Sequence, residues 1–202
     1  MLGGAAPATL KADVPQTQER AMDALVVYES IYGNTRAIAE AISDGVGAFA
    51  VLPVHAAQGS RGTLDLLVIG GPTHVHGLTT RRSRHVAAAT AHQDGRTHLE
   101  AGATTDPGLR TWLHDLSPGA AHHAAAFDTR LDRSPWLSGA AARGITRRLR
   151  HLGIDVIATE SFLVEDTEGP LQAGELERAR AWGAELARSL AAPHQQLVET
   201  EP

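Results

Sequence analysis

Short runs of apolar residues constrain the fold of this chain more than any other feature of its sequence. Leu66–Ile69 contains no polar residue, and Ala24–Tyr28 is apolar and partly β-branched. Both runs are too short for a buried helix, and continuous apolar runs of this kind are typical of central strands in a parallel sheet. Because such strands are covered on both faces, the chain must also supply helices for both sides of the sheet.

Strands and amphipathic helices alternate along the chain, which is the pattern of βαβ units. In the first predicted helix, Ile38 and Ile42 lie four residues apart and mark one buried face. We expect five strands, at residues 24–28, 48–55, 65–70, 121–127 and 155–164. Helices are expected at residues 35–46, 140–152 and 173–190. The predicted fold class is α/β, with a single doubly wound five-stranded parallel sheet.

Three segments do not follow this alternation. Residues 1–21 and 193–202 lack periodicity and are predicted as disordered tails on one domain at residues 22–192. Residues 78–119 are too long for a connection between a neighbouring strand and helix, so part of this region is expected to form a lid or a partner surface. Two further helices are expected within it, at residues 82–92 and 107–116.

Composition excludes several classes of function. The net charge of −5 argues against a nucleic-acid partner, because proteins that bind nucleic acids normally carry a basic surface. The absence of cysteine excludes disulfides, thiol nucleophiles, iron–sulfur ligation and cysteine-based zinc sites. No stretch has the apolar length of a membrane span, and residues 1–20 contain no apolar run of signal-peptide length. We therefore expect a cytoplasmic protein with no membrane span.

The loop after the first predicted strand has the composition of an anion site. It reads Ser30-Ile31-Tyr32-Gly33-Asn34-Thr35 and leads into a helix. A strand-to-helix turn offers free backbone N–H groups and the positive end of the helix dipole, which together suit a phosphate. Side-chain donors add to these N–H groups, and a glycine lets the backbone wrap closely around a ligand. The alternative is an ordinary helix start, capped by Ser30 or Asn34, that binds nothing.

Three motifs together resemble the flavodoxin family, over residues 24–190. The first is the Ser30–Thr35 loop, which resembles the family's phosphate loop. Gly70-Gly71-Pro72-Thr73-His74-Val75-His76-Gly77 follows the third strand and resembles the second FMN loop. Phe127-Asp128-Thr129-Arg130 follows the fourth strand, in the place of the third FMN loop. The resemblance implies a flavodoxin-like fold with FMN as the cofactor.

The resemblance also assigns residues to the cofactor. The phosphate would be held by Ser30, Ile31, Tyr32, Gly33, Asn34 and Thr35. The flavin edge would be lined by Pro72, Thr73, His74 and Gly77, and the backbone from Val75 through His76 to Gly77 would accept a hydrogen bond from the flavin. The third loop would contribute Phe127, Asp128, Thr129 and Arg130.

The sequence departs from the family pattern in two places. His74 stands where the family often has a larger stacking aromatic, which weakens the expected stacking. The third loop lacks the family's Gly-rich, Tyr-containing pattern, and Trp136 is the candidate for the second flavin face. His74 and His76 are not expected to bind a metal, because two imidazoles two residues apart in a loop need not converge and no carboxylate triad accompanies them.

The resemblance implies an electron carrier that takes electrons from a reductase and passes them to a redox partner, with no side chain acting as a catalytic acid or base. The alternative is an FMN-dependent oxidoreductase that reduces a small acceptor such as a quinone or porphyrin. The long 78–119 region and three arginines after the second loop, expected to face solvent, favour that alternative. These are Arg81, Arg82 and Arg84. A third class, a flavodoxin-like binding domain without cofactor, fits less well with two intact loops.

Overall fold

The computed structural model describes residues 22–57, 62–74, 77–94, 99–132 and 140–191, with the side chains of residues 92–94 excepted. A parallel sheet in the strand order β2-β1-β3-β5-β6 forms its centre. These five strands are Ala24–Tyr28 (β1), Ala50–Pro53 (β2), Leu64–His74 (β3), Ala121–Leu131 (β5) and Asp155–Val164 (β6). The α/β class and the parallel sheet are confirmed. The expected strand count is incomplete, because the short strand Gly77–Leu78 (β4) pairs antiparallel with β3.

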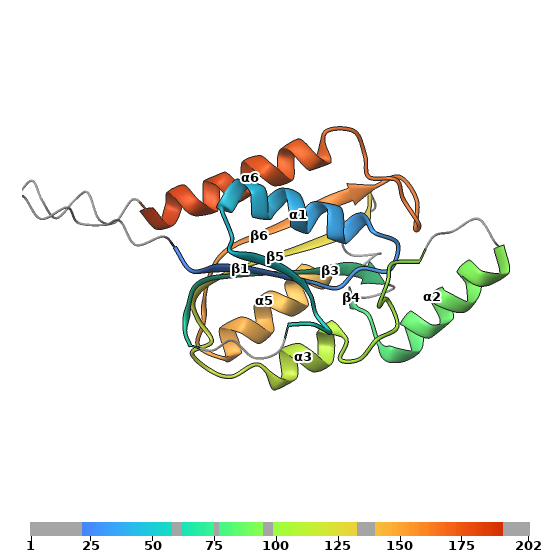
Figure 1. Cartoon of the computed structure of the whole chain (residues 1–202), viewed down its shortest axis with the longest axis horizontal. Helices are drawn as coiled ribbons and strands as arrows, with labels where there is room; N and C mark the ends of the chain where they lie inside the picture. The colour runs from blue at the N-terminus through green and yellow to red at the C-terminus, as the bar shows by residue number, and fades with distance from the viewer. Residues whose placement is uncertain (1–21, 58–61, 75–76, 95–98, 133–139, 192–202) are drawn as a thin grey trace, which may run out of the picture.

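Helices cover both faces of the sheet (Figure 1), as the continuous apolar strands require. Asn34–Val46 (α1) and Glu175–Ala191 (α6) lie on one face, whereas Leu109–Asp115 (α3) and Ala141–His151 (α5) lie on the other. Arg81–Asp94 (α2) projects beyond the carboxyl ends of the strands. Both helices expected within 78–119 are therefore present.

Alternating side chains along a strand belong to two separate hydrophobic clusters, one on each face of the sheet. In β1, Val26 packs with Ile38 and Ile42 of α1, whereas Val27 packs in the cluster that contains Ile145 of α5. Each of these side chains is inaccessible to solvent. The period of two along a strand explains the division, because successive side chains point to opposite faces of the sheet.

Glycine brings α1 and α6 into close contact. A Cβ atom at Gly183 of α6 would lie 2.3 Å from the carbonyl oxygen of Ile42, and one at Gly45 of α1 would lie 2.0 Å from the carbonyl oxygen of Arg180. No side chain can be accommodated at such distances without moving a helix. The contact is therefore backbone against backbone.

Two strands extend beyond their predicted ends. The expected 65–70 strand continues to His74, because Gly71 and Pro72 stay in register with Asp128 and Thr129 of β5. The expected 121–127 strand likewise continues to Leu131. In the part of the chain that the structure describes, no helix is long and apolar enough to cross a membrane.

Candidate functional site

The carboxyl ends of β1 and β3 define the position of the candidate site. The chain leaves β1 towards β2 on one side and leaves β3 towards β5 on the other, so the strand order reverses between them. Ligands of open α/β sheets bind in the crevice at such a switch point. The Ser30–Thr35 loop leaves β1 here and leads into α1.

The backbone of this loop presents donors towards the switch point. Gly33, the residue before α1, has a left-handed conformation with φ of 92°. Its N–H donates to Ser30 Oγ at 3.1 Å, and no side chain among the described residues caps the helix start. The first N–H groups of a helix have no acceptor inside it, so those that follow Gly33 suit an anion.

Side chains of the loop tie it to distant parts of the sheet. Thr35 is buried, and its Oγ1 lies 2.7 Å from Thr129 Oγ1 of β5. Asn34 Nδ2 donates to the carbonyl oxygen of Glu168 at 3.1 Å. Burial, and then the Glu168 carboxylate, raises the pKa of Tyr32, so its hydroxyl keeps its proton at neutral pH. These contacts fix the loop before any ligand arrives.

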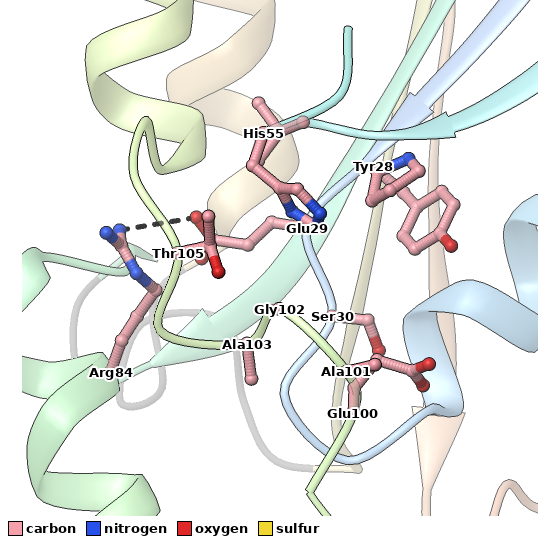
Figure 2. Close-up of a pocket in the computed structure, with 12 residues that line it drawn as sticks. Tyr28, Glu29, Ser30, His55, Arg84, Glu100, Ala101, Gly102, Ala103 and Thr105 are labelled. Carbon is pink, nitrogen blue, oxygen red and sulfur yellow. Dashed lines mark hydrogen bonds and ion pairs between the residues drawn. The ribbon is translucent and has the colours of Figure 1, made fainter.

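A carboxylate from the chain itself lies over the loop. Glu100 N–H donates to the carbonyl oxygen of Ile31 at 2.8 Å, and Glu100 Oε1 accepts from Arg36 Nη1 at 2.8 Å. A Cβ atom at Gly33 would lie 3.2 Å from Glu100 Oε2, so this oxygen is directly above the glycine. Figure 2 shows Glu100 beside Ser30 at the start of α1. The carboxylate marks a position that accepts an anion, as the oxygens of a phosphate would.

A second buried carboxylate, Glu29, precedes the loop. Only 4% of Glu29 is exposed, and three donors surround it. Leu109 N–H donates to Oε2 at 2.7 Å, and Thr79 Oγ1 donates to Oε1. Arg84 Nη1 lies 3.5 Å from Oε2, and Figure 2 shows this pair. The expectation that Arg84 faces solvent is wrong: its side chain is 3% exposed and also pairs with Asp106. Arg81 and Arg82 are exposed as expected.

The second motif holds the start of α5. Thr73 Oγ1 donates to Asp128 Oδ2 at 2.9 Å and accepts from Ala141 N–H at 3.0 Å. Asp128 Oδ2 also accepts from Ala142 N–H at 2.9 Å. Thr73 and Asp128 therefore act together as a cap for α5, although they belong to two different strands.

The third motif is not a loop, which corrects the sequence prediction. Phe127, Asp128, Thr129 and Arg130 all lie within β5. Phe127 is fully buried, and its ring fills the space over Gly70, where a Cβ atom would lie 2.0 Å from Phe127 Cζ. Phe127 is thus a core residue whose side chain is closed off from a ligand. Of the four residues, Arg130 alone is not classed as buried.

The remaining predicted residues lie at the end of β3. Pro72 is half-buried, and His74 pairs with Gly77 in the β3–β4 hairpin. Gly77 has φ of 138°, in the left-handed half of backbone space that glycine favours. Val75, His76 and Trp136 lie outside the described residues, as do the two predicted tails, residues 1–21 and 193–202.

Two side-chain hydrogen bonds bring the three motifs together. The Thr35–Thr129 bond joins the first motif to the third, and the Thr73–Asp128 bond joins the second to the third. Sequence reasoning missed Glu29 and Glu100. Glu29 could have been noticed as a charged residue directly after a buried strand, whereas no local signal distinguishes Glu100.

Solved flavodoxin structures share this fold. An archaeal flavodoxin is 17% identical with a TM-score of 0.51, and the match covers 84% of this chain and 99% of that one. Flavodoxin 1 from Bacillus cereus is 14% identical with a TM-score of 0.53, covering 82% and 97%. Fusobacterium nucleatum flavodoxin bound to flavin mononucleotide is 12% identical with a TM-score of 0.50, covering 83% and 98%. No protein-family model and no curated protein matches the sequence. The structural matches confirm the flavodoxin-like fold.

Proposed function

We propose that the chain binds FMN at the carboxyl ends of β1 and β3 and uses it to carry electrons between a reductase and a redox partner. One observation carries the proposal. The Ser30–Thr35 loop places an uncapped helix start and the left-handed Gly33 at the switch point of a flavodoxin-like sheet, with a carboxylate over that glycine. A phosphate monoester is the part of FMN that this arrangement suits.

The residues around the loop fit the cofactor in kind. The backbone from Ser30 to Thr35 would hold the phosphate, with the Ser30 hydroxyl and the Asn34 amide at its edge. The end of β3 and the hairpin that follows it would line the flavin. There we assign Pro72, Thr73, His74, Val75, His76 and Gly77. Trp136 remains our candidate for the second flavin face, whereas the buried side chain of Phe127 is no longer a candidate for contact with the cofactor.

FMN, when bound, supplies the one- and two-electron chemistry. The chain's own part is to bind and to orient. The Thr35–Thr129 and Thr73–Asp128 bonds keep the loop and the end of β3 in fixed positions relative to each other.

A second candidate function is the reduction of a small acceptor such as a quinone or porphyrin. The observation that favours it is the position of Arg84 and Glu100, which contact residues on either side of the Ser30–Thr35 loop where FMN would bind. A small-acceptor enzyme needs a cover, since it must hold its substrate over the flavin. An electron carrier needs the flavin edge exposed to a protein.

Binding and turnover test the proposal. Calorimetry should give tighter binding of FMN than of riboflavin, which lacks the phosphate, and equal affinities would contradict the role of the Ser30–Thr35 loop. The FMN-loaded protein is reduced chemically, freed of excess reductant, and then offered a quinone and, separately, cytochrome c. Saturable reduction of the quinone favours the oxidoreductase, and reduction of cytochrome c alone favours the carrier.

A further inference from the structure

We infer that Glu100 is a tethered anion that competes with the cofactor phosphate for the Ser30–Thr35 loop. The inference rests on the proposed FMN function and makes Glu100 the residue that limits affinity for the phosphate group. FMN then binds by exchange, in which the carboxylate leaves the loop as the phosphate enters.

The contacts of Glu100 are those expected of a bound anion. Its Oε1 forms an ion pair with the guanidinium of Arg36, on the first turn of α1, at 2.8 Å. Its Oε2 lies over Gly33, beside the helix start. The positive end of the helix dipole favours a negative charge at this position, whether that charge is a carboxylate or a phosphate. The side chain is only 14% exposed, so water screens its charge little.

The two anions cannot share the loop. A phosphate placed over Gly33 would meet Glu100 Oε2 within contact distance, and like charges at such separation repel strongly where water is excluded. Arg36 is 47% exposed and would be released to pair with the incoming phosphate. The described charged groups next to Arg36 are Glu100 and, from the next turn of α1, Glu40, while Glu168 acts on Tyr32 of the loop.

The segment that contains Glu100 is also attached to α2. Six residues beyond Glu100, Asp106 accepts from Arg84 of α2, and Arg84 pairs with Glu29 directly before the loop. The segment 99–106 is thus attached to the loop at one end and to α2 at the other. Loss of the Glu100 contacts frees the first attachment only, so we expect the segment to loosen when FMN binds.

Glu40 offers a matched control. Its Oε1 lies 3.6 Å from Arg36 Nε, and 58% of its side chain is exposed. Glu40→Gln and Glu100→Gln each remove one negative charge near the same arginine, and each keeps the size of the side chain. Only Glu100 lies over Gly33. Glu100→Gln also keeps the backbone bond to Ile31, so both variants should fold.

The experiment measures the affinity of the full-length wild type and both variants for FMN, riboflavin and inorganic phosphate by calorimetry. Glu100→Gln should bind FMN about tenfold more tightly than wild type, or ~1.4 kcal/mol, with riboflavin affinity unchanged. Glu40→Gln should stay within about threefold of wild type, because exposed charges are screened. Equal affinities of the two variants for FMN, or weaker binding by Glu100→Gln than by wild type, would overturn the inference.

Hydrogen exchange gives an independent readout. In the wild type, the amides of residues 99–106 should exchange faster after FMN is added, because this segment loses the side-chain attachment of Glu100 to Arg36. Unchanged exchange in the presence of bound FMN would also overturn the inference. If all three proteins bind FMN equally, Glu100 has no such role and the proposed function stands. If none binds FMN, the proposed function fails as well.

Discussion

Replacement of Arg84 by methionine should destabilise the protein strongly, because it leaves a buried carboxylate without its counter-charge. Glu29 and Arg84 are 4% and 3% exposed in their side chains, and Nη1 lies 3.5 Å from Oε2. At an effective dielectric constant of about 20, two unit charges at this distance attract by about 5 kcal/mol. The N–H of Leu109 and the hydroxyl of Thr79 still donate to the carboxylate, so part of that loss is compensated. We expect a net loss of about 3 kcal/mol.

Urea unfolding followed by circular dichroism measures this change. Arg82→Met is the control, since Arg82 lies on the same helix and is exposed, and it should change the stability by no more than about 0.5 kcal/mol. The double variant Glu29→Gln/Arg84→Met removes both charges and should recover at least half of the loss. A loss below about 1 kcal/mol for Arg84→Met, or a double variant less stable than Arg84→Met, would refute the reasoning.

Two further predictions concern stability. Gly183→Ala should cost about 1–3 kcal/mol in urea unfolding, because its Cβ atom would lie 2.3 Å from the Ile42 carbonyl oxygen. Gly144→Ala, in a helix with room for the methyl group, should instead be neutral or gain up to about 1 kcal/mol, and the reverse order would contradict the contact. Burial opposes ionisation of Glu175, but hydrogen bonds, chiefly from Arg178, outweigh it and lower its pKa from 4.5. Its stabilisation is therefore complete above pH 4.5 and declines as the pH falls below that value. Glu175→Gln should lower stability at pH 7 by more than it does at pH values below 4.5, and an equal loss throughout would exclude the carboxylate as the cause.

The central strands were predictable because their side chains are buried on both faces. No surface pattern is needed to recognise Ala24–Tyr28 or Leu66–Ile69, since every residue must be apolar. The continuation of β3 through Gly70–His74 was not predictable in this way. It depends on pairing with β5, which lies more than 50 residues further along the chain.

The errors at the site have the same origin. The sequence predicts Phe127 as a cofactor-binding residue. Its ring instead packs against Gly70, and only the register of two strands brings those residues together. The sequence predicts Arg84 as a solvent-facing residue, because its buried partner Glu29 lies 55 residues away along the chain and gives no local signal. The loop at Ser30–Thr35 was recognisable because its glycine, its donors and the helix after it are all local in sequence.

Helix α2 and residues 99–106 contact the candidate site on both sides of the Ser30–Thr35 loop. Arg84 binds Glu29, the residue before the loop, and Glu100 binds Ile31 and Arg36 within and after it. The two contacts differ in kind: the first is a buried ion pair between fixed elements, whereas the second occupies the position that an incoming phosphate requires. A bound phosphate would therefore release residues 99–106 at Glu100, while Arg84 still holds Asp106 at the other end of this segment.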